Sequence, residues 1–259
     1  MSEPAADIRM FGLDGIPEVR PGDDLPALIA AGLDASGLKL TRGDVLVVTH
    51  KIVSKAEGQL VHLPTVTPSA LATRWAEAWD KDARQVEVVL REARRIVRME
   101  RGIIIAETRH GFICANAGVD ASNVEAETVC LLPRDPDASA AALRTALGER
   151  SGLPPADWPG VVVSDSFGRP WRNGIVNIAI GAAGIAPLID YRGQRDAAGY
   201  ELHVTVLAAA DELAAASELV MHKLATRPVA LIRGYLAPIA AASGTGRDLI
   251  MDPTRDLFR

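Results

Sequence analysis

Two short polar segments interrupt an otherwise apolar chain, and their side chains are of the types that handle divalent metals and phosphates. They read Asn116-Ala-Gly-Val-Asp-Ala-Ser-Asn123 and Ser164-Asp-Ser-Phe-Gly-Arg-Pro-Trp-Arg-Asn-Gly174. Each places one carboxylate, Asp120 or Asp165, among hydroxyl and amide groups, and the second adds two arginines. Hard cations such as Mg²⁺ and Mn²⁺ prefer oxygen ligands and share them with phosphate oxygens, whereas arginine forks match phosphate geometry. This pattern is that of a metal ion holding a polyphosphate.

The same two segments are also good turn sequences. Asx and serine side chains bond to their own backbone, and glycine tolerates a positive φ. Neither segment is a phosphate loop that ends in Gly-Lys-Ser/Thr. From spacing alone, the metal–phosphate interpretation and the turn interpretation both stay open.

Composition predicts a compact protein and gives no sign of a nucleic-acid partner. The chain has 259 residues, of which 48% are hydrophobic and 24% charged, so it can bury a large core. The net charge of -5 gives no electrostatic footprint for nucleic acid. Basic residues gather only at 91–101, where their spacing indicates a solvated helix face.

The remaining composition favours a reducing, aqueous compartment. Cys114 and Cys130 lie in apolar strand-like stretches and form no Cys-x-x-Cys motif, so we expect buried free thiols and no zinc site. The first residues have neither a basic nor an apolar signal region. The longest apolar run, 174–189, is interrupted by Asn177 and Pro187 and is too short to span a bilayer. We therefore expect a cytoplasmic protein without a membrane partner.

Periodicity and capping residues predict elements along the whole chain. We expect helices at 25–33 and 82–97, a helix from 67 that carries Trp75 and Trp79, and helices at 137–148, capped by Asp137, and 211–224, with Asp211 as its cap or first-turn acid. We expect strands at 44–49, 161–163, 177–184, 202–208 and 229–233, a hairpin of 102–106 with 112–115, and a charged loop at 190–196. Both polar segments then begin where a strand ends, which is a common place for sites.

These elements predict a mixed α+β (mixed α/β) fold with largely antiparallel sheets and flanking helices. A regular doubly wound sheet would lack the hairpin. No Pro/Gly/Ser linker is long enough to separate domains, so we expect a single domain over 1–259, either as one body or as two interleaved lobes.

Seven segments, spread over nearly the whole chain, resemble the coenzyme F420:L-glutamate ligase family in the family's order. They are 15–24, 53–58, 116–123, 164–169, 179–181, 190–193 and 210–214. Seven coincident segments are far more specific than any one of them. The resemblance therefore favours the metal–phosphate interpretation over the turn interpretation.

The resemblance implies a GTP-dependent and divalent-metal-dependent ligase, active in coenzyme F420 biosynthesis. Such an enzyme adds L-glutamate to the lactyl side chain of the F420 precursor through an acyl phosphate. The implied small molecules are the precursor, L-glutamate and GTP, with Mn²⁺ or Mg²⁺ and a monovalent cation such as K⁺. The implied assembly is an intertwined homodimer. Some relatives carry an additional C-terminal flavin domain, which we do not expect within these 259 residues.

Carried over by position, the resemblance implies roles for individual residues. Asp120 and Asp165 resemble ligands of one metal ion, and Ser166 resembles a ligand of a second. Asp120, Asp165 and Lys55 are the implied catalytic residues. The implied nucleotide contacts are Ile16, Pro17, Glu18, Val19, His50, Lys51, Lys55, Asn123, Met221 and Lys223.

Two positions leave this assignment open. His222 departs from the family pattern, which usually has a small residue such as glycine there. Arg169 and Arg172 are expected substrate-binding residues, and the sequence does not choose between nucleotide phosphate and the phosphodiester of the acceptor.

Two other classes of function fit the same residues. A metal-dependent phosphoryl hydrolase or nucleotidyl transferase would use the same carboxylates, and the hydrolase would release phosphate from nucleotide without an acceptor. A nucleotide-binding regulator would bind tightly without turnover. Assays of nucleotide turnover with and without an acceptor distinguish these classes.

Overall fold

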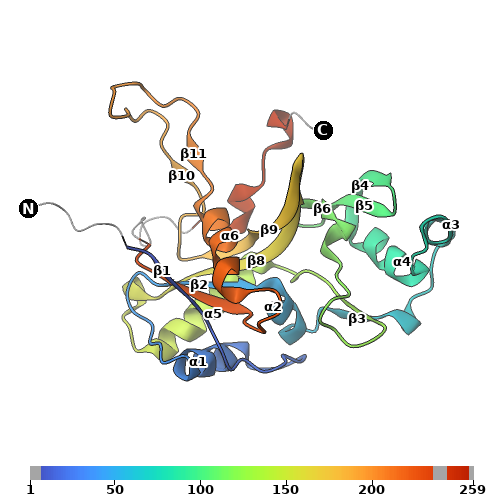
Figure 1. Ribbon diagram of the computed structural model, residues 1–259, viewed down its shortest axis with the longest axis horizontal. Helices are drawn as coiled ribbons and strands as arrows, with labels where there is room; N and C mark the ends of the chain where they lie inside the picture. Colours follow the sequence, from blue (N-terminus) through green and yellow to red (C-terminus); the bar gives the residue numbers. More distant parts are fainter. Residues whose placement is uncertain (1–6, 236–243, 257–259) are drawn as a thin grey trace, which may run out of the picture.

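A five-stranded sheet forms the centre of the molecule (Figure 1). The computed structural model describes residues 7–235 and 244–256. The strand order is β1 (Arg9–Gly12), β12 (Val229–Arg233), β2 (Val45–Thr49), β8 (Gly160–Arg169) and β9 (Arg172–Ala183). The β2–β8 pair is parallel, and the other neighbouring pairs are antiparallel.

Helices cover both faces of this sheet. In β2, Val45 and Val47 face a core that includes helix α6 (Ala209–Met221). Leu46 and Val48 face the opposite core, to which α1 (Leu25–Ala35) and α5 (Pro136–Ser151) contribute. This alternation is the period of two that a strand imposes, and because both faces are buried the strand reads as continuously apolar.

A second lobe has its own core, centred on residues such as Ile104 and Val89, and lies to the right in Figure 1. A three-stranded antiparallel sheet, two helices and a separate two-stranded pair build it. Its elements are α3 (Ala70–Trp79), α4 (Ala83–Glu92), β4 (Ala93–Glu100), β5 (Ile103–Thr108) and β6 (Ile113–Ala115), with β3 (Leu60–His62) paired to β7 (Thr128–Cys130). The first polar segment follows β6 and so leaves this lobe toward the central sheet.

The prediction of a helix over 82–97 was wrong at its C-terminal end, because α4 stops at Glu92 and β4 follows directly. The arginines at 94, 95 and 98 lie on a strand and not on a helix face. Two register shifts against β5 each add a residue to β4, so its half-buried residues recur every third position, at Ala93, Ile96 and Met99. A strand with two bulges therefore imitated a helical period.

The second polar segment also differs from its prediction. Strand β8 does not stop at 163 but continues to Arg169, and a tight turn at Pro170 and Trp171 joins it to β9. The segment therefore lies within a hairpin. Polar residues persist in this strand because β2 ends at Thr49, which leaves the edge of β8 beyond Ser164 facing the pocket described below.

Smaller corrections concern element ends. Helix α5 is capped by Asp135, not Asp137, whose carboxylate instead accepts the backbone N–H groups of Ala182 and Gly246. Asp211 is a first-turn acid of α6. Strand β11 is only Val206–Leu207, and α6 stops at Met221 rather than at 224.

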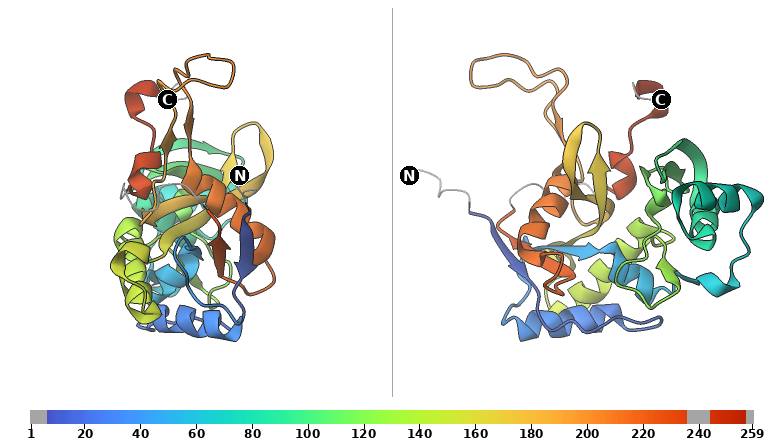
Figure 2. Two further views of the ribbon diagram at one scale, coloured as in Figure 1. Left: turned by 90° about the vertical axis from the view of Figure 1, so that its left-hand side faces the viewer. Right: turned by 45° about the vertical axis from the view of Figure 1, so that its right-hand side comes forward.

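The fold class, the hairpin of β5 with β6 and the two buried free cysteines are confirmed. Strand β10 (Ile189–Asp190) pairs with β11 at the base of a long arm that projects from the body of the molecule (Figure 2). Among the described residues, we find no helix with the length and hydrophobicity needed to cross a membrane.

Candidate functional site

One pocket of about 520 Å³ brings together almost all of the residues singled out from the sequence. Its wall is formed by α2 (His50–Ala56), β8, β9, the end of α6 and the loops before α1 and after α6. The predicted residues that line it are Ile16, Pro17, Glu18, Val19, His50, Lys51, Lys55, Asp120, Asn123, Asp165, Ser166, Met221 and Lys223. Their convergence comes from segments that are far apart in the chain.

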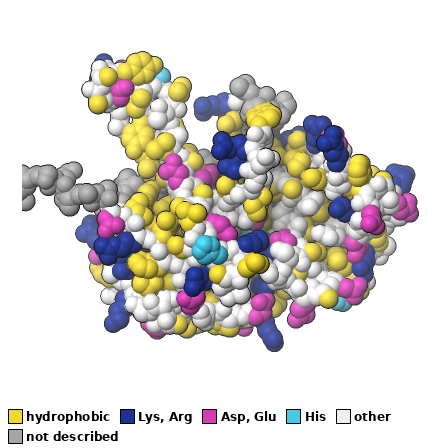
Figure 3. All heavy atoms as spheres, viewed as in Figure 1, with side chains coloured by type: hydrophobic (Ala, Val, Ile, Leu, Met, Phe, Trp, Pro, Cys, Tyr) yellow, Lys and Arg dark blue, Asp and Glu magenta, His cyan; other side chains and the backbone are white. Residues whose placement is uncertain are grey.

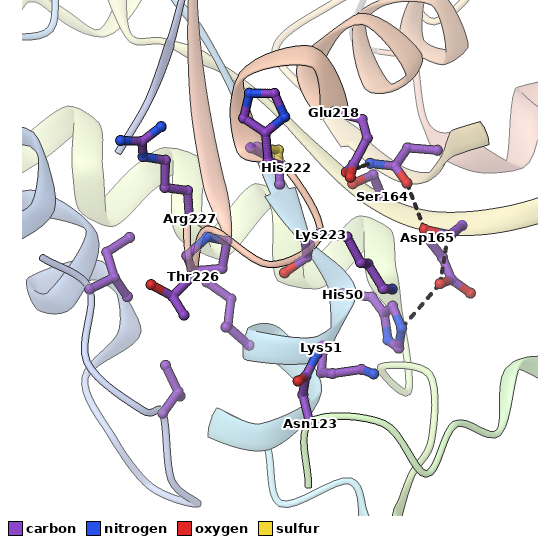
Figure 4. A pocket seen from close by; sticks show the side chains of 18 of the residues that line it. His50, Lys51, Asn123, Ser164, Asp165, Glu218, His222, Lys223, Thr226 and Arg227 are labelled. Atoms are coloured by element: carbon purple, nitrogen blue, oxygen red, sulfur yellow. Dashed lines mark hydrogen bonds and ion pairs between the residues drawn. The ribbon is translucent and has the colours of Figure 1, made fainter. Parts of the chain in front are cut away.

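The parallel pair of strands explains the centre of this pocket. Thr49 and Ser164 are register partners at the carboxyl ends of β2 and β8, so the residues that follow them are neighbours. His50 Nε2 lies 3.2 Å from Asp165 Oδ1, and Figure 4 shows this contact. The His50 side chain is buried, and its Nδ1 lies 3.4 Å from Ser54 Oγ. Asp165 is therefore held in place by a fixed imidazole.

Lys51 forms an ion pair with Asp120, a second aspartate of the pocket. Its Nζ donates to Asp120 Oδ2 at 2.5 Å and to the carbonyl and hydroxyl oxygens of Ser122 at 2.8 Å each. Burial raises the pKa of Asp120, but the hydrogen bonds from Lys51 and Ser122 outweigh burial and hold the pKa below its ordinary value. Asp120 is thus an anion that already binds a cation.

Lys55 forms a second ion pair across the pocket. It belongs to α2 and is buried, with 7% of its side chain exposed, whereas its partner Glu18 is 71% exposed. The pair ties the loop that contains residues 16–19 to α2. A buried ammonium group needs an anionic partner, because an unpaired buried charge is strongly destabilising. A phosphate oxygen could replace the Glu18 carboxylate as the partner of Lys55 without leaving this charge unpaired.

Two further polar residues of the wall were not predicted from the sequence. Ser166 Oγ donates to Asn177 Oδ1 at 2.6 Å, and Asn177 Nδ2 donates to Glu218 Oε2 at 3.1 Å. Two signals could have found them. Asn177 is a polar interruption of an apolar run, and Glu218 lies three residues before Met221, hence on the same face of α6.

The loop after α6 closes one side of the pocket. Two of its residues, His222 with φ +51° and Thr226 with φ +54°, have left-handed backbone conformations that glycine adopts more readily. The resemblance implies a small residue such as glycine at 222, and glycine adopts this backbone conformation without strain. Arg227 also lines the pocket and donates to Asp14 Oδ1 at 2.7 Å.

Arg169 and Arg172 lie at the tip of the β8–β9 hairpin, outside this pocket. Arg169 donates to the carbonyl oxygen of Asn173 at 3.2 Å, and the exposed Trp171 lies between the two arginines in the turn. The structure therefore does not bring these arginines to the carboxylates of the same chain. Their role in substrate binding stays a prediction.

The oxygen ligands available in the pocket fit a hard divalent cation whose coordination shell is completed by phosphate oxygens. Among the described residues, no three His, Cys, Asp or Glu side chains form a ready-made metal cage. Mg²⁺ rarely uses such a cage, since it keeps several waters and takes one or two carboxylates together with substrate phosphates. Asp120 and Asp165 in one pocket, beside the hydroxyl groups of Ser164 and Ser166, meet that requirement.

On the face shown in Figure 3, lysine and arginine side chains are interspersed with acidic ones and form no continuous stripe. Three basic groups of the pocket, Lys51, Lys55 and Arg227, are each paired with an individual carboxylate. This arrangement suits a small anionic ligand that carries several charges within a few ångströms.

Comparison with known proteins gives a consistent result. Residues 15–234 match the model of the family described as F420-0:Gamma-glutamyl ligase. The chain is 46% identical over 245 residues to the coenzyme F420:L-glutamate ligase of Methanopyrus kandleri, covering 93% of this chain and 94% of that protein. It is 42% identical to the protein of that name from Methanothermobacter thermautotrophicus, covering 97% of this chain and 99% of the relative. The Methanocaldococcus jannaschii relative is also 42% identical, over 84% and 85% of the two chains.

Proposed function

Because the chain belongs to the F420-0:gamma-glutamyl ligase family, we propose that it is a ligase that joins L-glutamate to the F420 precursor by an amide bond. We propose GTP as the nucleotide, Mn²⁺ or Mg²⁺ as the divalent metal and a monovalent cation such as K⁺ as a further cofactor. The observation that carries the proposal is the single pocket that holds Asp120, Asp165, Lys51 and Lys55.

The chemistry explains why such a pocket is needed. A carboxylate does not react with an amine at neutral pH, because its oxygen is a poor leaving group. In the proposed reaction, the carboxylate of the acceptor attacks the γ-phosphorus of GTP, and GDP leaves. The glutamate amine then attacks the acyl phosphate, which expels inorganic phosphate and forms the amide. The enzyme has to align the carboxylate with the phosphorus and to neutralise charge on the transferred group.

The residues of the pocket divide this work between them. Asp120 and Asp165 would hold the divalent metal, and Ser166 would hold a second ion. The metal, when bound, supplies Lewis-acid neutralisation of the phosphoryl oxygens. Lys51 and Lys55 bind nucleotide phosphates once they exchange their present partners, Asp120 and Glu18. His50 fixes the orientation of Asp165 through its 3.2 Å contact.

The proposal is tested with GTP, Mn²⁺, L-glutamate and an acceptor whose carboxylate carries oxygen-18. We expect one GDP and one phosphate for each amide formed, with the label in the phosphate, because the bond to the carbonyl carbon breaks in the second step. Mass spectrometry of the product and of the released phosphate gives the amount of amide formed and the position of the label. Formation of GMP and pyrophosphate, with the label in GMP, would contradict the acyl-phosphate route. Phosphate release without any acceptor would instead indicate a hydrolase.

We also propose that the protein acts as an intertwined homodimer. The arm between β10 and β11 carries exposed apolar side chains, with Tyr200 at 64% and Val204 at 86% exposure, and Figure 3 shows apolar side chains on it among polar and charged ones. Ile103 and Ile175 on two other strands are also more than half exposed. We expect these exposed apolar side chains to be buried in a large subunit interface.

The assembly is measured by sedimentation velocity. We expect a dimer of about twice the chain mass at micromolar concentration, and we expect Val204→Asp to shift the equilibrium toward monomer because it places a charge in the interface. Glu201→Gln, a change three residues away that adds no charge, is the matched control. A wild-type monomer at micromolar concentration would rule out an obligate dimer.

A further inference from the structure

Ser164 has a buried hydroxyl group that no other described residue satisfies. The residue is 1% exposed, and its Oγ lies in the wall of the pocket without a hydrogen-bond partner in the described part of the chain. The other buried serine and threonine hydroxyls of that part have partners. They belong to Ser54, Thr108 and Ser217.

The position of Ser164 in the sheet directs its side chain toward the α6 side of the pocket. Side chains alternate along β8, and Val162 packs against the α6 face, so Ser164 and Ser166 point to that same face. Ser166 begins the chain of hydrogen bonds that runs through Asn177 to Glu218. Ser164, Asp165 and Glu218 all line the pocket, and Figure 4 labels the three residues.

A local irregularity of the sheet fixes this arrangement. Val163 is paired with Gly181 but Ser164 with Ala179, so strand β9 has an extra residue opposite this point. Such bulges occur next to sites because they redirect side chains and interrupt pairing. Thr49, the partner of Ser164 on the other side, is the last residue of β2. Ser164 therefore stands at the last fully paired position before β8 becomes an open edge of the pocket.

The neighbouring carboxylates indicate what the hydroxyl would bind. Asp165 Oδ1 already contacts His50 Nε2 and accepts a hydrogen bond from the backbone N–H of Ser166. Glu218 accepts a hydrogen bond from the side-chain amide of Asn177. A hydroxyl can both donate and accept a hydrogen bond. Its proton would attract an anionic ligand oxygen, and because the group is neutral it adds no charge beside these carboxylates. Hydrogen bonds from a hydroxyl to an ionised oxygen are short and strong.

We propose that the Ser164 hydroxyl donates a hydrogen bond to an anionic oxygen of the reacting group. This oxygen belongs either to the terminal phosphoryl group of the nucleotide or to the carboxylate that receives it. The inference rests on the proposed function, which it deepens by adding Ser164 to the residues that contact substrate. A buried hydroxyl reserved for a ligand is unpaired in the free protein, whereas a structural hydroxyl is paired at all times.

The test therefore measures two quantities, the melting temperature of the free protein and its affinity for ligands. Ser164→Ala should leave the melting temperature of the free protein unchanged or higher, because it removes an unpaired polar group. Ser217→Ala is the matched control, since it removes a buried serine hydroxyl that donates to the carbonyl of Ala214 at 2.7 Å and does not line the pocket. The control should lower the melting temperature and leave ligand binding unchanged.

Nucleotide binding is measured by calorimetry with Mn²⁺ and either GDP or β,γ-imido-GTP. The use of the acceptor is measured as its kcat/KM in the amide-forming reaction. If the oxygen is phosphoryl, Ser164→Ala weakens imido-GTP at least about tenfold while GDP changes by less than about threefold. If it is carboxylate, both nucleotides bind as in wild type, and kcat/KM for the acceptor falls at least about tenfold. Ser164→Thr, which keeps the hydroxyl, should restore whichever value falls.

Two results would overturn the inference. One is a lower melting temperature of Ser164→Ala with nucleotide affinities and acceptor kinetics as in wild type, which would show a structural hydroxyl. The other is an equal loss for GDP and imido-GTP, which would place the contact away from the terminal phosphoryl group. Failure of the proposed function looks different, because wild type itself would then form no amide with GTP.

Discussion

Replacement of Asp165 by asparagine is expected to reduce turnover by at least about a hundredfold at saturating Mn²⁺. The change keeps the shape of the side chain but removes the negative charge that a metal ion needs and that faces His50 at 3.2 Å. Asp120→Asn should have an effect of the same size, since it removes the charge of the other proposed metal ligand. The measurement is kcat for amide formation with GTP, acceptor and L-glutamate.

Asp80→Asn is the matched control for both variants. Asp80 is exposed, lies in the second lobe and has a left-handed φ of +51°, which asparagine also tolerates. It should retain wild-type turnover, and circular dichroism should show the same fold for all three variants. Full activity of either pocket variant at saturating metal would remove that residue from the ligand set.

The second large effect is expected from Lys51→Met, which keeps the apolar stem and removes the ammonium group. In the free protein this ammonium binds Asp120 and Ser122, so it competes with a metal ion for the same carboxylate. We expect Mn²⁺ to bind the nucleotide-free variant at least about tenfold more tightly than wild type. We also expect GTP to bind at least about tenfold more weakly, because a phosphate partner is lost.

Calorimetry with Mn²⁺ alone, and with GTP at fixed Mn²⁺, gives the two affinities separately. Lys81→Met is a suitable control because Lys81 lies in the second lobe, outside the pocket. Wild-type affinities of Lys51→Met for both ligands would show that Lys51 neither competes with Mn²⁺ for Asp120 nor contacts GTP, and its bond to Asp120 would then be purely structural.

The sequence predicted the components of the site better than their surroundings. Asp120, Asp165, Lys51 and Lys55 were identified from residue types and a family resemblance, and all four line one pocket. Their convergence was foreseeable only in part, because it depends on the parallel pairing of β2 with β8, which joins Thr49 to Ser164. Local periodicity contains no information on which strands become neighbours.

The errors have physical causes that single-sequence patterns do not resolve. The bulges of β4 changed its spacing from two to three, so Ile96 and Met99 imitated a helix. Hydrogen-bond satisfaction is equally invisible before the fold is known. Nothing in the sequence distinguishes Ser164, whose hydroxyl has no described partner, from Ser217, whose hydroxyl donates to a carbonyl oxygen of its own helix.

The strand order has a consequence for how the protein is made. Strand β12 lies between β1 and β2, so the sheet next to the pocket is completed only after residues 229–233 have been synthesised. Synthesis adds about 5–20 residues per second, so β12 follows β2 by roughly ten to forty seconds. During this interval β2 has one unpaired edge, and its residues 45–48 are all apolar. Such an edge is a template for wrong pairing with other chains. Newly made chains should therefore depend on chaperones during this interval, and the pocket is complete only after β12 has been synthesised.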